Sequence, residues 1–129
     1  MKPEPFLPEP MEAPYVRDRH SGLVFHRAGS RVLYADTDRS DVVYHANYLR
    51  YFEFGRASLM RDVAVPYAQV EAEGFVYPII DLGLSFYAPL RYDDPFFVHT
   101  RPGQRDRVRI RFDYAITHGD SGALLARGH

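Results

Sequence analysis

The chain has 129 residues, of which 46% are hydrophobic and 26% charged, and its formal net charge is −1. This length and composition predict one globular domain with one core and leave no room for two. The small net charge gives no electrostatic reason to expect nucleic acid or an anionic membrane surface as a partner. The chain contains no cysteine, which excludes disulfides, thiolate metal ligands and a cysteine nucleophile, and is typical of a reducing compartment.

No apolar run is long enough to cross a membrane, and the first residues lack the basic and apolar regions of a signal peptide. We therefore expect a cytoplasmic protein. Residues 1–22 contain five prolines among charged residues, which disfavours both helix and strand. This composition predicts an extended or disordered N-terminal arm, either a loose tail or a segment that folds over a partner subunit. The folded domain is expected over residues 23–129.

After the arm, the chain predicts a strand and then a helix. Residues 23–35 are rich in β-favouring side chains, and Gly29 is expected to interrupt this strand as a bulge or a hairpin turn. The helix is expected over about residues 45–62, and only a narrow stripe of its surface is polar, so it must be covered on several sides. Pro66 ends the helix, and a short second helix is predicted over residues 67–73.

Four strand-like segments follow. Apolar residues alternate with polar ones over residues 80–87, 96–101, 107–117 and 123–129, and turn residues at 119–122 separate the last two segments. One strand, a long buried helix and four strands in an antiparallel meander predict an α+β fold. In this fold, a sheet of about five strands curls around one central helix.

Candidate catalytic groups gather between the first strand and the helix. Asp36, Asp38 and Asp41 lie there, within six residues of one another. The first N–H groups of a helix have no intrahelical partners and carry the positive end of its dipole, so they could hold a carbonyl oxygen. Asp38 could attack that carbonyl or activate a water. The residue types alone favour a simpler interpretation, in which the aspartates only cap the turn and the helix.

Other polar residues give weaker signals. His45 could orient a substrate carbonyl or a water, or could offer its backbone N–H, although a single histidine is more often a packed, hydrogen-bonded one. The histidines show no ligand spacing, so we predict no metal. Five arginines within residues 101–111 could bind phosphates or could be the solvated face of a strand. No motif for nucleotide hydrolysis, serine hydrolysis or dinucleotide redox chemistry is present.

The motifs around the helix start resemble a known family. Residues 32–38 (Val-Leu-Tyr-Ala-Asp-Thr-Asp), 42–48 (Val-Val-Tyr-His-Ala-Asn-Tyr) and 51–53 (Tyr-Phe-Glu), with Arg56, closely resemble the 4-hydroxybenzoyl-CoA thioesterase family of hotdog-fold acyl-CoA thioesterases, including its YbgC-like bacterial members. The likeness covers roughly residues 24–129. It implies a hotdog fold, a homodimer or homotetramer, and an active site between subunits.

The resemblance also implies an activity. Acyl-CoA thioesterases hydrolyse an acyl-CoA thioester to a carboxylic acid and free coenzyme A, and they need no metal or redox cofactor. Asp38 matches the position of the nucleophile or general base of the family. His45 matches the helix start, whose backbone N–H would polarise the thioester carbonyl.

The substrate contacts implied by the resemblance lie in two places. Val43 and Tyr44, beside the helix start, are candidate contacts for the acyl group or coenzyme A. Arg105 and Arg107 lie where the family places basic residues for the phosphates of coenzyme A.

One residue departs from the family pattern. Asp41 replaces a glycine that usually precedes the paired valines. Glycine permits a positive φ, which aspartate tolerates better than most residues, but aspartate adds a negative charge near the reacting centre. That change could narrow the acyl pocket, change the substrate or signal lost activity. The alternative function is therefore a non-catalytic acyl-CoA-binding hotdog module. A hotdog dehydratase or hydratase is a second enzymatic alternative, but its local motif is not found.

Overall fold

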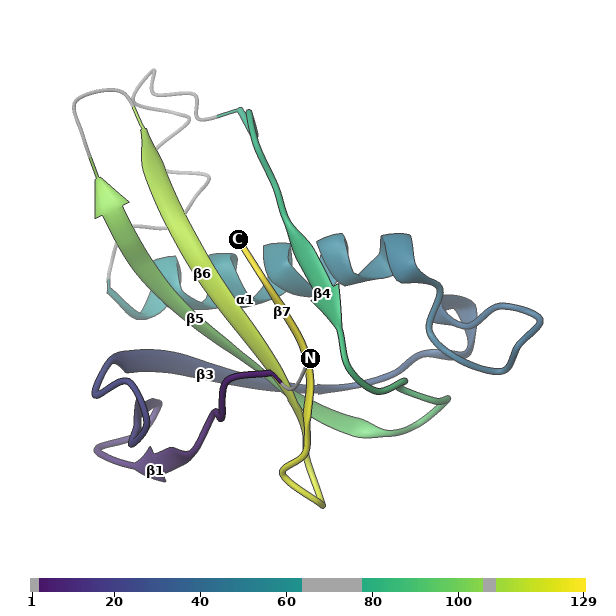
Figure 1. The fold of residues 1–129 in the computed structure, drawn as a ribbon. Helices are drawn as coiled ribbons and strands as arrows, with labels where there is room; N and C mark the ends of the chain where they lie inside the picture. The colour runs from purple at the N-terminus through teal and green to yellow at the C-terminus, as the bar shows by residue number, and fades with distance from the viewer. Residues whose placement is uncertain (1–2, 64–77, 106–108) are drawn as a thin grey trace.

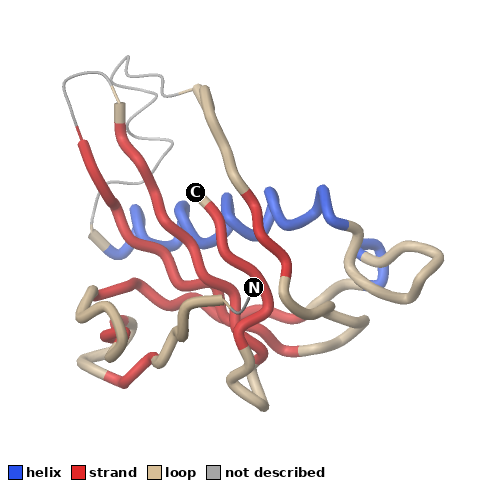
Figure 2. The backbone as a smooth tube through the Cα atoms, viewed as in Figure 1, coloured by secondary structure: helices blue, strands red, loops and turns tan. Residues whose placement is uncertain are grey.

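One long helix lies across one face of a single antiparallel sheet, which curls around it (Figure 1, Figure 2). The computed structural model describes residues 3–63, 78–105 and 109–129. In chain order, the elements are β1 (Pro8–Pro10), β2 (Tyr15–Asp18), β3 (Val24–Arg31), the 3-10 turns η1 (Tyr34–Asp36) and η2 (His45–Asn47), α1 (Tyr48–Asp62), β4 (Leu84–Phe86), β5 (Pro95–Arg105), β6 (Ile110–His118) and β7 (Leu124–Gly128). The strands lie in the order β1-β2-β3-β5-β6-β7-β4. The predicted α+β architecture is confirmed.

The helix α1 packs one apolar face against the middle of the sheet. Residues spaced three or four apart are buried along it, namely Tyr48, Tyr51, Phe52, Gly55 and Leu59. Gly55 allows close approach to β5, because a Cβ there would lie 2.5 Å from Val98. On the same helix, Leu49 is 41% exposed, so the described chain does not cover α1 on every side. The helix ends at Asp62, as predicted, and the predicted second helix over residues 67–73 lies outside the described residues.

The main core fills the space between α1 and the sheet. Phe52 stacks on Tyr114 of β6 with ring centroids 4.3 Å apart, and Tyr51 packs against Phe96 of β5 at 4.5 Å. Alternate residues of each strand face this core, which is the physical origin of the period of two in the sequence. The core therefore holds α1 firmly in the curl of the sheet.

Two details of the predicted sheet are wrong. Gly29 lies inside β3, in register with Phe97 of β5, and no bulge or turn interrupts the strand there. The Phe97 ring covers this glycine, 3.2 Å from where a Cβ would be. The four later strands do not form one meander, because β4 pairs with β7 at the end of the sheet rather than with β5. A local period identifies a strand but contains no information about its partner.

The described part of the N-terminal arm belongs to the sheet, so the prediction of a loose tail is wrong for residues 3–22. β1 pairs with β2, and β2 pairs with β3. Pro8 and Pro10 are tolerated in β1 because it is the edge strand of this side of the sheet, where a missing N–H costs little. Just before β1, Phe6 is buried in a second apolar cluster with Phe25 of β3.

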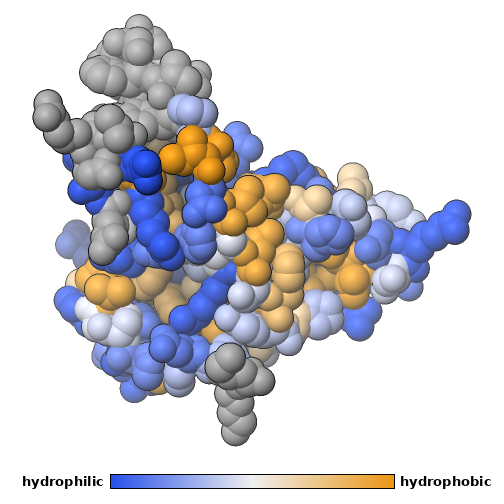
Figure 3. Space-filling view, turned by 45° about the horizontal axis from the view of Figure 1, so that its top comes forward, coloured by the Kyte–Doolittle hydropathy of each residue, from blue (hydrophilic) through white to orange (hydrophobic). Residues whose placement is uncertain are grey.

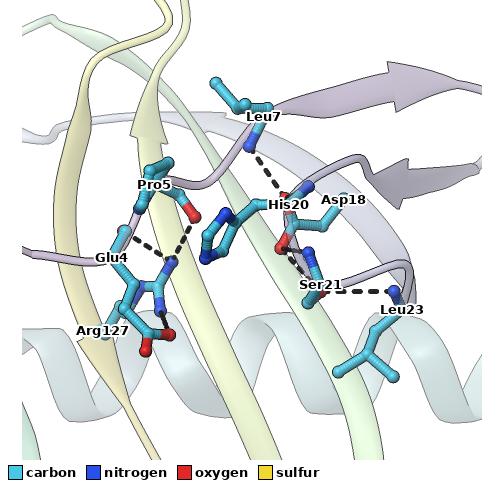
Figure 4. A network of polar contacts seen from close by, with 8 residues as sticks. All are labelled: Glu4, Pro5, Leu7, Asp18, His20, Ser21, Leu23 and Arg127. Carbon is cyan, nitrogen blue, oxygen red and sulfur yellow. Dashed lines mark hydrogen bonds and ion pairs between the residues drawn. The ribbon is translucent and has the colours of Figure 1, made fainter.

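Polar contacts also hold the arm in place (Figure 4). The Leu7 N–H donates a hydrogen bond of 2.9 Å to Oδ1 of Asp18 at the end of β2. The guanidinium of Arg127 in β7 donates to the backbone carbonyls of Glu4 and Pro5 at 3.0 and 3.1 Å. The arm is thus tied both to its own hairpin and to the last strand of the chain.

Exposed apolar side chains follow the segment before and along β4. Their exposed fractions are 65% for Ile79, 70% for Ile80, 48% for Leu82, 47% for Phe86 and 39% for Tyr87. We call residues 79–87 the β4 edge, because β4 is the last strand on its side of the sheet. Figure 3 shows apolar side chains gathered on one face of the molecule. Among the described residues, no helix has the length and apolar character needed to cross a membrane.

Candidate active site

Residues 36–44 form a tight hairpin just before the helix start. Thr37 and Val43 form a β-bridge, and the Asp38 N–H donates to the Val42 carbonyl at 3.0 Å. The loop closes when the Asp41 N–H donates to the Asp38 carbonyl, also at 3.0 Å. Asp41 has a φ of 62°, the left-handed conformation for which hairpins of this kind use glycine. Asp41 therefore adopts the backbone conformation that glycine most readily supplies at this position.

Asp38 is exposed on this 36–44 hairpin. Its Oδ1 accepts a hydrogen bond of 2.8 Å from the Ser40 N–H, which fixes the carboxylate at the tip. The carboxylate borders a depression of about 710 Å³, which we call the Asp38 depression. It is lined by Tyr34, Thr37, Asp38, Arg39, Asp41, Arg91 and Tyr92. Two arginines thus share this depression with two aspartates.

The loop between β4 and β5 supplies one wall of the Asp38 depression. The Val43 N–H donates to the Leu90 carbonyl at 2.8 Å, and the Val32 N–H donates to the Asp94 carbonyl at 3.0 Å. These bonds hold the loop against the hairpin, so Arg91 lines the same depression as Asp38. Sequence reasoning missed Arg91, because 53 residues separate it from Asp38 and no local pattern joins the two.

The helix start lies at the other end of the hairpin. The Tyr44 N–H donates to the Asp36 carbonyl at 2.9 Å, and the Asn47 N–H donates to the Tyr44 carbonyl at 2.9 Å. Among the described residues, the His45 N–H has no backbone hydrogen-bond partner. The sequence predicts a helix that begins near His45, but α1 begins at Tyr48, and His45 is the first residue of the 3-10 turn η2 that leads into it. A role of the His45 N–H as an oxyanion donor stays a prediction.

A second depression, of about 340 Å³, lies beside the helix start. Its lining is mostly apolar and consists of Val43, His45, Tyr48, Phe86, Tyr87, Ala88 and Pro89. Val43 is buried, whereas Tyr44 is 45% exposed, and the Tyr44 ring lies 4.4 Å from the His45 ring between centroids. We call this space the His45 depression. It offers an apolar surface next to the free N–H.

The structure brings only some of the predicted site residues together. Asp38 and His45 flank one hairpin but line different depressions of a single chain. Arg105 is exposed and is the last residue of β5. In Figure 1, β5 ends on the side of the molecule where α1 ends, whereas the 36–44 hairpin lies on the side where α1 begins. Arg107 lies outside the described residues.

Asp36 is the most buried polar group of the hairpin, with 2% of its surface exposed. Its carboxylate accepts hydrogen bonds from the Leu33 N–H at 3.0 Å and the Tyr51 hydroxyl at 2.8 Å, and it pairs with Arg50. Burial acts to raise the pKa of the Asp36 carboxyl, but the contacts with Arg50, Leu33 and Tyr51 together lower it. Burial and the contact with Asp36 raise the pKa of Tyr51. The Asp36 carboxyl group is thus ionised, and both of its oxygens have hydrogen-bond or ion-pair partners.

The fold and the sequence both place this chain in a family. A sheet curled around one helix is the hotdog fold, and the crystal structure of Slr0204, a 1,4-dihydroxy-2-naphthoyl-CoA thioesterase from Synechocystis, superposes with a TM-score of 0.74. The superposition covers 79% of this chain and 75% of that one, at 27% identity. Residues 32–129 match the thioesterase-like superfamily, and the chain belongs to that superfamily.

Two proteins of known sequence show how close the relationship is. YneP of Bacillus subtilis is 42% identical over 69 residues, which cover 54% of this chain and 50% of YneP. The acyl-CoA thioester hydrolase YbgC of Escherichia coli O157:H7 is 34% identical over 94 residues, which cover 73% of this chain and 70% of YbgC. The match thus spans half the length of YneP and a larger part of YbgC. The family resemblance predicted from the motifs is confirmed.

Proposed function

We propose that this protein is an acyl-CoA thioesterase, which hydrolyses an acyl-CoA thioester to a carboxylic acid and free coenzyme A. The observation that carries the proposal is an exposed carboxylate, Asp38, on the short hairpin that leads directly into η2, where the His45 N–H has no backbone partner among the described residues. Membership of the thioesterase-like superfamily and the name of YbgC support the same reaction. The reaction needs no metal or redox cofactor.

In this proposal, the His45 N–H binds the thioester carbonyl oxygen and stabilises the negative charge that develops on it. Asp38 then acts in one of two ways. As a general base, it takes a proton from water, hydroxide adds to the carbonyl carbon, and the tetrahedral intermediate expels coenzyme A thiolate, which takes up the proton. As a nucleophile, it expels the same thiolate to form an acyl anhydride, which water then hydrolyses.

We propose that a second copy of the chain completes the site. A thioester must contact Asp38 and the His45 N–H at once, but in one chain these groups line separate depressions. A homodimer is the minimum assembly, and a homotetramer would be two such pairs. The exposed apolar β4 edge borders the His45 depression through Phe86 and Tyr87, which supports this edge as the place where the second copy binds.

Positive charge for coenzyme A has two sources in this proposal. Arg39 and Arg91 line the Asp38 depression and can contact the nearer phosphates. Arg105 and Arg107 follow from the family resemblance. Arg105 ends β5 and does not line the Asp38 depression of its own chain, which favours contact with coenzyme A bound at the Asp38 of another copy.

The test is thiol release from short, medium, long and aryl acyl-CoA substrates. We expect the native chain to hydrolyse at least one of them and Asp38→Asn to lose about 100-fold or more in kcat. His45→Pro removes the N–H at a position where proline fits the first turn of a helix, so it should lose a similar factor. His45→Ala keeps the N–H and should lose less.

The matched control is Asp120→Asn, which removes the same charge from the turn between β6 and β7 and should keep native activity. The chain has no cysteine, so it contributes no thiol background. If acyl-CoA raises the melting temperature of the native chain but no substrate releases thiol, the protein is a binding module and the thioesterase proposal is wrong.

A further inference from the structure

We propose that Asp36 is a positioning residue, which holds the 36–44 hairpin with Asp38 and the helix start with the His45 N–H in one fixed arrangement. The kinetic part of this inference rests on the proposed thioesterase function. Its structural part does not, because the order of the hairpin can be measured without any substrate.

The carboxylate of Asp36 joins the hairpin to the first turns of α1. One oxygen accepts the Leu33 N–H at 3.0 Å and the Tyr51 hydroxyl at 2.8 Å, and the other pairs with Arg50. Tyr51 is buried, and the Arg50 side chain is 54% exposed, so the pair reaches from the core to the surface. The entry to the hairpin is thereby fixed to one face of the helix.

The backbone carbonyl of Asp36 joins the exit of the hairpin to the same helix. It accepts the Tyr44 N–H at 2.9 Å and the Asn47 side-chain amide at 2.8 Å. Asp36 lies two residues before Asp38, and Tyr44 lies directly before His45. A single residue therefore holds both chain segments that carry the proposed chemistry.

The Asp36 carboxylate suits this role and not that of a catalytic base. A carboxylate is purely an acceptor when ionised, and all three groups around this one are donors. Its burial and its contacts leave no oxygen directed at a substrate, whereas Asp38 is exposed beside a depression. An asparagine at position 36 would direct its NH₂ group at one of these donors and lose at least one contact.

The test compares Asp36→Asn with Tyr51→Phe, which removes only one of the three donors. Amide exchange should be at least about tenfold faster for the Leu33 and Tyr44 N–H groups in Asp36→Asn, with β6 amides as the unchanged reference. For a hydrolysed acyl-CoA, kcat should fall about 10- to 100-fold with KM nearly constant, because the misplaced groups act in the transition state. Tyr51→Phe should show a smaller effect on both quantities.

The pH profile separates positioning from catalysis. If Asp36 only positions Asp38, the profile of kcat keeps its native shape at a lower level in Asp36→Asn. A profile that loses its acidic limb would make Asp36 itself the base and overturn the proposal.

Unchanged amide exchange in both variants would overturn the proposal as well. If the native chain releases no thiol, the proposed function fails, and amide exchange still decides whether Asp36 fixes the hairpin. Asp120→Asn serves as the control for charge removal.

Discussion

Burial separates the three aspartates of the 36–44 hairpin. Asp36 is buried and ionised, Asp38 is exposed beside a depression, and Asp41 occupies a left-handed backbone conformation. The sequence places all three in a turn before a helix. Because each of them is an aspartate, the residue type does not distinguish their roles. Burial and the donors supplied by Leu33 before the hairpin and by Arg50 and Tyr51 in α1 distinguish Asp36 from Asp38.

The left-handed conformation of Asp41 leads to a stability prediction. Asp41→Val places a β-branched side chain at a φ of 62° and should lower the free energy of unfolding by about 1–3 kcal/mol. Asp41→Gly should change it by less than about 1 kcal/mol, because relief of strain offsets the greater freedom of glycine in the unfolded chain. Urea denaturation measures both values. Equal destabilisation by valine and glycine would contradict the backbone explanation.

At the scale of elements, the N-terminal arm covers His99 of β5 with the side chain of Phe6. The Phe6 ring lies 4.7 Å from the His99 ring between centroids, and the His99 side chain is completely buried. Its Nε2 lies 2.9 Å from the Thr117 hydroxyl oxygen. Burial and, to a lesser degree, the charge of Arg27 lower the pKa of His99 to about 3, while Asp18 opposes the shift. The histidine is therefore neutral in the folded protein.

This buried histidine predicts how stability depends on pH. The unfolded chain binds the His99 proton near pH 6.5, whereas the folded chain binds it only near pH 3. Acid therefore favours the unfolded state, and stability present above pH 6.5 is lost as the pH falls, by up to about 1.4 kcal/mol for each pH unit. Denaturation of the native chain and His99→Gln between pH 7.5 and 5 checks this. Parallel curves would contradict the prediction.

The sequence predicts single elements better than it predicts their partners. The end of α1 at Asp62 and the alternation in β5 and β6 follow from local periods. The pairing of β4 with β7 and the place of Arg91 beside Asp38 depend on contacts between distant segments, which no local period records. The prolines of β1 gave the wrong prediction because an edge strand does not need their missing donors.

At the scale of the whole molecule, the β4 edge predicts self-association. The Gly83 N–H donates to the carbonyl of His129, directly after β7, and the Tyr87 N–H donates to the carbonyl of Leu125 in β7. Because hydrogen-bonding groups alternate sides along a strand, residues between Gly83 and Tyr87 direct backbone groups away from β7. Among the described residues, no strand pairs with the other edge of β4, and such an edge lined with apolar side chains is a template for pairing with another copy. This geometry supports a dimer whose sheets meet at β4, next to the His45 depression.

The double variant Ile80→Lys with Leu82→Lys tests this edge. Both side chains are exposed, so the fold should persist. If the native chain forms the proposed dimer, the added charges should make the variant sediment as a monomer. Thiol release should fall with the loss of the dimer. The control pair Leu23→Lys with Val24→Lys changes exposed apolar residues elsewhere and should leave the dimer intact. A dimer that survives the Ile80 and Leu82 changes would place the interface on another surface.

The position of β7 between β6 and β4 also has a consequence during protein synthesis. β4 pairs with no other strand than β7 among the described residues, so it has no partner until residues 124–128 have been translated. Until then, a growing chain presents one open edge on β6 and the apolar residues 79–87. Because such edges promote aggregation, we expect the nascent chain to depend on protection by chaperones late in translation and to lose that need once β7 is inserted.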